Sequence, residues 1–246
     1  MSRATFEIDA ALRTFLAREQ RDGAVTVECA RAATLKQAIE ALGVPHTEIG
    51  RLLVNGTPAT LSRTVREGDH VEVFAHEPGA APFEAPLAFI ADAHLGGLAH
   101  MLRMLGFDTL YDQNFQDRAV VDLGQSEHRV VLTRDRELLK CRDVLRGCYV
   151  HALKAEAQLR EVAARYPIAR QMRPFTLCLH CNAALKPATA EAIIQQVPAR
   201  IQARYSTFMC CPECRRVYWE GSHWERMRNV LAATLDVPVA EVRSRV

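Results

Sequence analysis

The chain has 246 residues, of which 49% are hydrophobic and 24% charged, and its net charge is +2. This composition is typical of a globular protein, and the length predicts one to three domains. The chain contains no run of about 18 apolar residues, and its N-terminus lacks an apolar signal core. We therefore expect a cytoplasmic protein that does not enter a membrane. The basic excess lies at the C-terminal end, where residues 151–246 carry 14 basic and 8 acidic side chains.

The first 76 residues predict a small α+β domain with the order strand, strand, helix, strand, strand. The helix is expected to begin after Thr34, a favoured N-cap residue, and to end at Gly43. The Asn55-Gly56 pair is typical of a hairpin turn. The strands are expected at residues 4–10, 24–29, 52–56 and 70–75.

Residues 77–86 contain three prolines and no periodicity, which predicts a linker. Beyond it, apolar runs alternate with segments of helical spacing, so residues 87–170 are expected to form a parallel sheet with helical crossovers. Strands are expected at 87–91, 107–111, 129–133 and 148–153, and helices at 95–105, 117–127, 136–141 and 154–166. Residues 171–246 form the third expected unit, with a helix over 224–234.

Aspartates follow the carboxyl ends of the predicted parallel strands. Such strands end at one edge of their sheet, which is where open α/β sheets bind ligands. Clustered carboxylates need a compensating cation, and Mg²⁺ or Mn²⁺ prefers oxygen ligands and substrate phosphates. The candidate residues at the three strand ends and at the start of the intervening helix are Asp92, Asp112, Asp135 and Asp117.

A second interpretation applies to the same aspartates. Asp92, Asp117 and Asp135 all stand just before predicted helices, where Asp is a favoured N-cap. The pattern alone does not decide between caps and metal ligands. Arg134 and Arg136 flank Asp135 and are candidates for holding a phosphate.

Two C-x2-C pairs stand 29 residues apart in the basic C-terminal part: Cys178 with Cys181, and Cys211 with Cys214. Each pair can direct two thiolates at one ion, and four cysteines close a tetrahedral zinc site with no position left for water. We therefore expect a structural zinc ion, with a redox C-x2-C pair as the alternative.

Aromatic residues cluster just after the second cysteine pair, at Tyr218, Trp219 and Trp224. Such side chains can stack on unpaired bases. The alternative is a small aromatic core against the zinc-bound segment.

Several motifs together resemble the Mut-seven C-terminal RNase family, over roughly residues 87–231. The motifs are FIADAHLGGLAHMLRMLGFDTLYD, RVVLTRDRELL, CLHC and CPECRRVYWEGSHWERM. The resemblance implies a PIN-like nuclease fold with an appended zinc ribbon. It also implies that Asp92, Asp117 and Asp135 are the metal-binding carboxylates, and that the four cysteines are the ribbon ligands. One departure is Arg215, which stands where the family often has glycine after the last ribbon cysteine.

The N-terminal part, about 4–76, is similar to the ubiquitin-like β-grasp domain found ahead of this nuclease in bacterial relatives. Its segment VNGTPATLSRTVREGDHVEVF resembles sulfur carriers, which need a free C-terminal Gly-Gly. Here the strand continues into Glu77-Pro78-Gly79 without a diglycine, so sulfur transfer is not expected. Binding of a protein partner or of RNA by this domain is left open.

These features lead to one main hypothesis and two alternatives. The main hypothesis is a ribonuclease that cleaves single-stranded RNA with Mg²⁺ or Mn²⁺ at the aspartates. The first alternative is a non-catalytic zinc-ribbon protein that binds RNA or serves as a scaffold. The second is a toxin-like component regulated by a partner on the β-grasp domain.

Overall fold

The computed structural model describes residues 1–79 and 86–243. The N-terminal domain is a five-stranded sheet with the order β2-β1-β5-β3-β4, in which β1 and β5 are parallel and the other pairs antiparallel. Helix α1 covers this sheet, and together they make a ubiquitin-like fold. The elements are β1 (Ser2–Ile8), β2 (Val25–Cys29), α1 (Leu35–Ala41), β3 (Ile49–Val54), β4 (Thr57–Pro58) and β5 (His70–Ala75).

Local sequence signals explain the helix and the hairpin of this domain. Thr34 caps α1 through a capping box with Gln37, as its position predicts. Asn55 and Gly56 both have positive φ, at 52° and 74°, which suits the two-residue turn between β3 and β4. Phe6, Ile8 and Ile39 are fully buried in one core between sheet and helix. The linker expected at residues 77–86 falls largely on residues 80–85, which lie outside the described part.

The central part contains a four-stranded, fully parallel sheet with the order β7-β6-β8-β9, as the alternating pattern predicts. Its strands read as apolar runs because both faces are covered. The elements are β6 (Ala88–Ala91), α2 (Gly96–Met104), β7 (Asp108–Leu110), α3 (Asp117–Ser126), β8 (Val130–Thr133), α4 (Arg136–Lys140), β9 (Gly147–Tyr149) and α5 (Ala155–Arg165).

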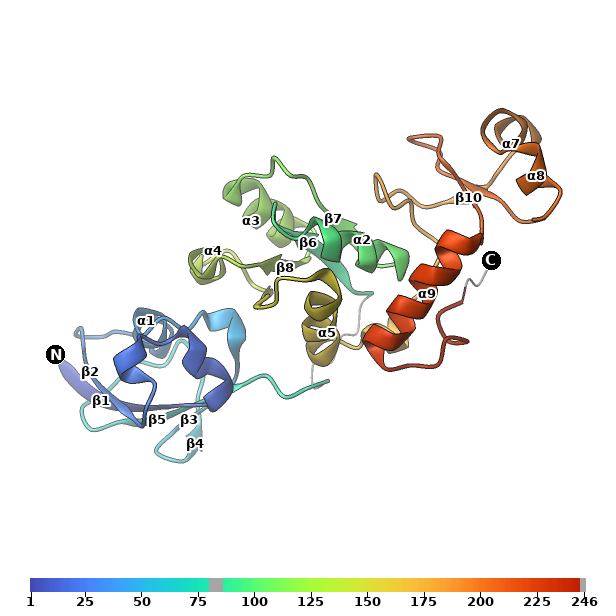
Figure 1. The fold of residues 1–246 in the computed structure, drawn as a ribbon. Helices are drawn as coiled ribbons and strands as arrows, with labels where there is room; N and C mark the ends of the chain where they lie inside the picture. Colours follow the sequence, from blue (N-terminus) through green and yellow to red (C-terminus); the bar gives the residue numbers. More distant parts are fainter. Residues whose placement is uncertain (80–85, 244–246) are drawn as a thin grey trace.

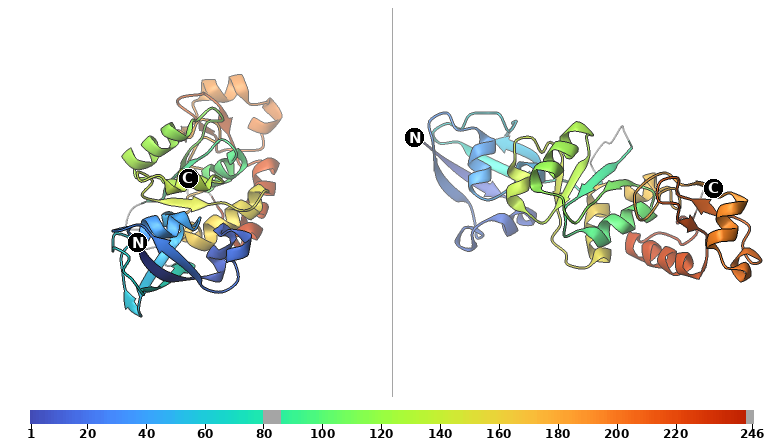
Figure 2. Two further views of the ribbon diagram at one scale, coloured as in Figure 1. Left: turned by 90° about the vertical axis from the view of Figure 1, so that its left-hand side faces the viewer. Right: turned by 90° about the horizontal axis from the view of Figure 1, so that it is seen from above.

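Alternating strand residues divide between two cores, one on each face of this sheet. Phe89 and Leu132 belong to the larger core, which also contains residues of α2 and α5. Ile90 and Val131 belong to the smaller core with residues of α3 and α4. The helices therefore form two layers with the sheet between them (Figures 1 and 2).

The C-terminal part combines a small antiparallel sheet, β10-β11-β12, with short helices and the long helix α9. Trp224 and Leu231 of α9 are buried in the larger core of the central part. Sequence reasoning predicted α9 but not α6, α7 or α8. The elements are α6 (Ile168–Gln171), β10 (Lys186–Pro187), α7 (Ala190–Gln196), α8 (Ala199–Gln202), β11 (Met209–Cys210), β12 (Val217–Tyr218) and α9 (Ser222–Leu235).

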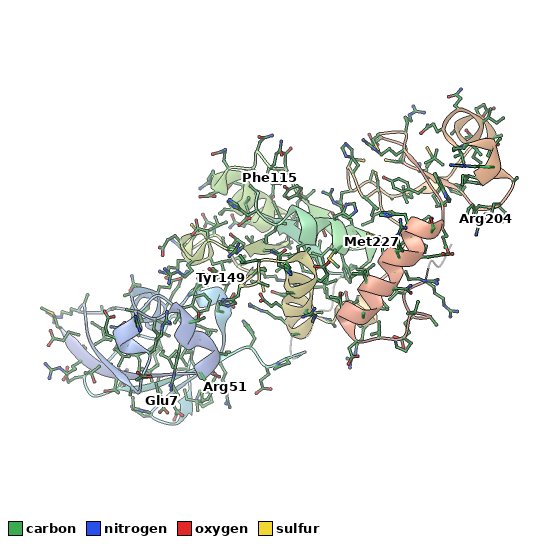
Figure 3. All side chains as sticks on the ribbon, viewed as in Figure 1. Glu7, Arg51, Phe115, Tyr149, Arg204 and Met227 are labelled. Atoms are coloured by element: carbon green, nitrogen blue, oxygen red, sulfur yellow. The ribbon has the colours of Figure 1, made fainter. Side chains whose placement is uncertain are left out.

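The three parts lie in a row, with the ubiquitin-like domain at one end and α7 and α8 at the other (Figures 1 and 2). Tyr149 lies between the ubiquitin-like domain and the central part. Arg204 lies at the end of the row that is far from the ubiquitin-like domain (Figure 3). Within the described residues, no helix has both the length and the apolar character needed to span a bilayer.

The ubiquitin-like domain contacts the central part through a short 3-10 helix, η3 (His46–Glu48). The Glu48 carboxylate accepts hydrogen bonds from the Tyr149 backbone N–H and from Arg165, both at 2.9 Å. The same Arg165 donates to the backbone oxygen of Thr47. On the other side of η3, His46 Nε2 donates to the Val144 oxygen at 3.0 Å.

Candidate active site and candidate metal centre

The parallel sheet places the candidate aspartates along one edge. Asp92 directly follows β6, and Asp112 and Asp135 each stand two residues beyond β7 and β8. Because these strands are parallel, their carboxyl ends lie side by side. The edge therefore combines loops from three neighbouring strands, the usual position for a ligand site in an α/β sheet.

Asp92 is the most enclosed of these carboxylates, with a relative exposure of 9%. One of its oxygens accepts the His94 N–H at 2.9 Å. The other accepts the Thr133 hydroxyl and, at 3.2 Å, the Arg134 N–H. The Thr133 hydroxyl oxygen in turn accepts the Asp135 N–H at 2.9 Å. Thr133 therefore ties the loop after β6 to the loop after β8.

The capping interpretation holds for one aspartate only. Asp135 is the N-cap of α4 and accepts the Glu137 N–H at 2.8 Å. Asp117 is the first residue of α3, whose N-cap is Gln116. Asp92 stands before Leu95, the N-cap of α2, and so does not cap that helix.

The four aspartates do not come together as one ion-binding group. Among the described residues, the four cysteines are the group of His, Cys, Asp or Glu side chains that lie close enough to hold one metal ion. Asp112 accepts the Asn114 N–H at 2.8 Å in its own loop, and Asp112, Asp117 and Asp135 are all exposed. The edge thus presents one buried carboxylate with exposed carboxylates around it.

The two arginines of the predicted phosphate pair have different surroundings. The Arg134 side chain is exposed, and the backbone N–H of this residue donates to Asp92. Arg136 instead donates to the backbone oxygen of Phe15, at 3.2 Å, in the ubiquitin-like domain. Sequence reasoning also missed His94, whose Nδ1 lies 3.8 Å from an Asp92 oxygen, and Thr133. Thr133 belongs to the Leu-Thr-Arg-Asp motif, and this motif could have identified it as a candidate site residue.

The four cysteine sulfurs lie within 4.8 Å of one another at the base of the small sheet. Cys178 and Cys214 have their sulfurs 3.5 Å apart, and those of Cys181 and Cys211 are 3.3 Å apart. Tetrahedral zinc with Zn–S bonds of about 2.3 Å requires sulfurs about 3.8 Å apart. The donor set therefore fits a zinc ion with small adjustments.

Both cysteine loops have the same backbone form. Asn182 follows Cys181 with φ of 69°, and Arg215 follows Cys214 with φ of 65°. In each loop this residue donates its N–H to the oxygen of the first cysteine, at 2.9 and 3.0 Å. Arg215 thus takes the left-handed conformation that glycine adopts most easily, so its backbone is strained there.

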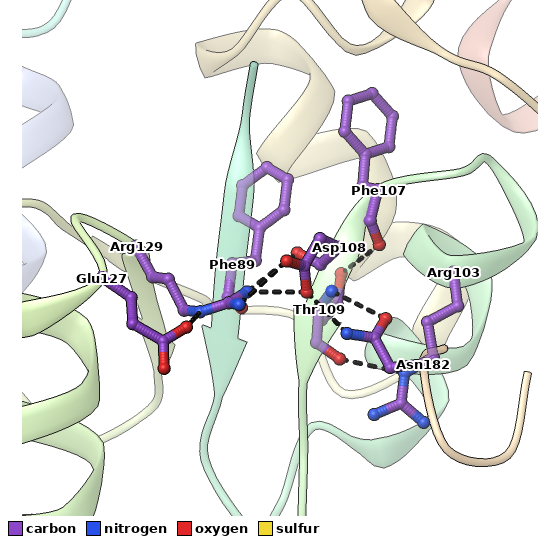
Figure 4. A network of polar contacts seen from close by, with 8 residues as sticks. All are labelled: Phe89, Arg103, Phe107, Asp108, Thr109, Glu127, Arg129 and Asn182. Atoms are coloured by element: carbon purple, nitrogen blue, oxygen red, sulfur yellow. Dashed lines mark hydrogen bonds and ion pairs between the residues drawn. The ribbon is translucent and has the colours of Figure 1, made fainter. Parts of the chain in front are cut away.

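The first cysteine loop is fixed to the central sheet by a polar network (Figure 4). Arg103 donates to the backbone oxygens of Thr109, Leu179 and His180 at 2.9, 3.2 and 2.9 Å. The Asn182 side chain donates to Asp108 and accepts the Thr109 N–H at 3.0 Å.

Asp108 is the centre of that network. It pairs with Arg129 through two N–H···O contacts of 2.8 Å each. Partial burial raises the pKa of Asp108, but the hydrogen bonds from Arg129 and Asn182 outweigh it and hold the pKa below its ordinary value. Asp108 is therefore a structural carboxylate that binds the ribbon to β7.

Comparisons with known proteins agree with the two-part resemblance of the sequence. A family model described as the Mut7-C RNAse domain matches residues 87–231, and one described as Mut7-C ubiquitin matches residues 1–79. The first match covers more than half of the chain. Among solved structures, the chain is similar to SAMP1 from Haloferax volcanii, with 21% identity over 32% of this chain and 99% of that chain, at a TM-score of 0.26. No curated protein matches.

Proposed function

The chain belongs to the Mut7-C RNAse family, and from this premise we propose that it is a metal-dependent ribonuclease acting on single-stranded RNA. The observation that carries the proposal is the position of Asp92. It is a nearly buried carboxylate at the carboxyl end of β6, linked through Thr133 to the loop that holds Asp135.

The donor set at this edge suits Mg²⁺ or Mn²⁺. Magnesium is commonly held by one or two carboxylates plus substrate phosphate and water, so a tight cluster of four carboxylates is not needed. Asp92 and Asp135 are the first candidates for ligands, with Asp112 and Asp117 on the same edge. When bound, the ion would supply charge neutralisation at the phosphate and lower the pKa of a water molecule.

The residues around Asp92 have roles of their own. The Thr133 hydroxyl and two backbone N–H groups occupy lone pairs of the Asp92 carboxylate and fix its orientation. The exposed Arg134 side chain can pair with an RNA phosphate beside it. Arg136 contributes to domain contact in this structure, so Arg134 is the better phosphate partner.

We further propose that the four cysteines hold a structural zinc ion and that the chain divides at residues 1–76, 87–170 and 171–246. The sulfur spacing supports the zinc, and elemental analysis that finds no zinc on the folded protein would contradict it. Because α9 shares its core with residues 87–170, we expect the last two parts to unfold together.

The test is cleavage of a labelled single-stranded RNA by zinc-loaded protein, with Mg²⁺, with Mn²⁺ and with neither. Leaving out the added metal avoids a chelator, which would also remove zinc. We expect cleavage only with the added metal, and a loss of at least about 100-fold in Asp92→Asn and Asp135→Asn. Asp122→Asn is the matched control, because Asp122 is exposed on α3 and pairs with Arg118.

A non-catalytic RNA-binding protein is the second candidate. It is favoured by the local hydrogen bonds that Asp112 and Asp135 already accept from backbone N–H groups. Wild-type protein that binds the RNA but cleaves it no faster than Asp92→Asn would establish this candidate instead.

A further inference from the structure

A cavity of about 380 Å³ lies between the zinc ribbon, the segment after α8 and the end of α2. We call it the ribbon pocket. It is separate from the aspartate edge, since none of the candidate aspartates lines it. The lining residues used below are Met104, Arg204, Tyr205, Trp219, His223 and Trp224.

Aromatic rings form much of the ribbon pocket. Tyr205 and Trp219 are half-buried, so each ring keeps a face or edge available to a ligand. Trp224 is 6% exposed and packs against Phe175, with ring centroids 5.4 Å apart at 60°. Flat, sequence-tolerant stacking on such rings is how proteins hold unpaired bases.

Trp224, which lines this pocket, also carries an unused hydrogen-bond donor. Its indole Nε1 is buried and has no acceptor among the described residues. A buried donor without a partner is unfavourable, so such groups usually have an acceptor in the functional state. Every nucleobase carries ring-nitrogen or carbonyl acceptors on its edge, which purely apolar ligands lack.

The charge at the ribbon pocket suits a phosphate next to the base. Arg204 is exposed, and its guanidinium lies 5.6 Å from the centre of the Tyr205 ring. His223 is a second basic residue at the opening, and no Asp or Glu lines the pocket in the described part of the chain. Arginine pairs readily with phosphate oxygens.

Helix α2 links the ribbon pocket to the aspartate edge. Its N-terminus follows the Asp92 loop, whereas Met104 at its C-terminus lines the pocket. The helix has nine residues, which corresponds to about 13 Å. A strand of RNA held at the pocket can therefore reach the aspartates within a few nucleotides.

We propose that the ribbon pocket binds one unpaired base of the RNA, stacked on Tyr205 and Trp219, with the adjoining phosphate paired to Arg204. This inference rests on the proposed ribonuclease function and assigns part of its substrate binding. It predicts that the ribbon holds the RNA by a base while the aspartate edge acts on the backbone.

The chain offers a direct probe, because both of its tryptophans, Trp219 and Trp224, line this pocket. The experiment titrates zinc-loaded protein with a short oligouridylate, without Mg²⁺ or Mn²⁺, and follows tryptophan fluorescence. We expect saturable quenching by the oligonucleotide and binding at least about tenfold weaker for its counterpart with abasic positions. Equal binding of the two oligonucleotides would overturn the proposal.

Variants test the individual contacts. We expect Tyr205→Ala and Arg204→Gln each to weaken binding of the oligouridylate about tenfold, while the matched control Arg200→Gln, on α8 outside the pocket, changes it less than about twofold. Trp224→Phe keeps a ring but removes the N–H donor, and it should weaken binding without loss of zinc. Unchanged binding in Tyr205→Ala and Trp224→Phe would overturn the proposal.

Two further outcomes are informative. Uridine 5′-monophosphate that binds as tightly as the oligonucleotide would indicate a free-nucleotide site and overturn the assignment to RNA. Because the titration requires no cleavage, base-dependent binding together with inactive protein would refute the proposed nuclease and leave the base-binding pocket standing.

Discussion

The residue after the second cysteine of each cysteine loop adopts a backbone conformation that residues other than glycine rarely take. Asn182 and Arg215 share this left-handed backbone, but their side chains differ in surroundings. Asn182 bonds to Asp108 and Thr109, whereas the Arg215 side chain is exposed. The same change to glycine should therefore have opposite effects at the two positions.

We expect Arg215→Gly to leave stability unchanged or raise it by about 0.5 kcal/mol, because relief of backbone strain exceeds the added freedom of the unfolded chain. Asn182→Gly should lower stability by about 2 kcal/mol, since a hydrogen bond to a charged group is lost. Urea unfolding of the zinc-loaded variants and of wild type measures both changes in the free energy of unfolding. Equal destabilisation by both changes would contradict the role given to the Asp108 network.

The candidate site shows what residue-level reasoning could and could not predict. Asp92, Asp112 and Asp135 lie at one sheet edge because the strands are parallel, which the alternating pattern predicts. The link from Asp92 through Thr133 depends on the register between β6 and β8, which no local pattern contains. The hydrogen bond from Arg136 to Phe15 depends on how two domains dock, which local sequence patterns do not predict.

At the scale of elements, the strands and core helices were predictable where they bury a periodic apolar face. Helices α7 and α8 were missed because neither has a buried residue, so their sequences carry no amphipathic pattern. Prolines Pro187 and Pro198 also favoured an irregular segment there. Short helices without a buried face are thus the elements that periodicity misses.

The Asp108 network that joins β7 to the first cysteine loop should give stability a distinct pH dependence. The pKa of Asp108 lies below the ordinary value of 3.8 in the folded protein, so the unfolded chain takes up the proton first as the pH falls. The contribution of Asp108 to stability is therefore complete above about pH 5 and is lost as the pH falls through the lower pKa of the folded state.

Comparison of wild type with Asp108→Asn tests this. The difference in free energy of unfolding should be constant from neutral pH down to about pH 5 and should shrink at lower pH. Asp122→Asn, which alters an exposed pair, serves as the control. A difference that grows as the pH falls would show that another group controls the link.

At the scale of the whole molecule, the contacts of η3 form one part of the interface that holds the ubiquitin-like domain, beside the bond from Arg136 to Phe15. Glu48 and Arg165 are 12% and 14% exposed, and their 2.9 Å ion pair joins the two domains. Arg165 lies next to Tyr166 and also donates to Thr47, so the ion pair belongs to a larger set of contacts. The ubiquitin-like domain is therefore docked on the central part through side-chain contacts.

We expect Glu48→Ala to destabilise this docking by about 3 kcal/mol, because it leaves the Arg165 guanidinium enclosed without its carboxylate. Glu28→Ala, which removes a solvent-exposed ion pair with Arg3 in the same domain, should leave the docking unchanged. Hydrogen exchange at the Tyr149 N–H, which donates to Glu48, reports the interface directly. Faster exchange in Glu48→Ala alone would support docking through η3. Equal exchange in both variants would mean that the ubiquitin-like domain is held elsewhere, so that a partner binding near η3 could not change its position on the central part.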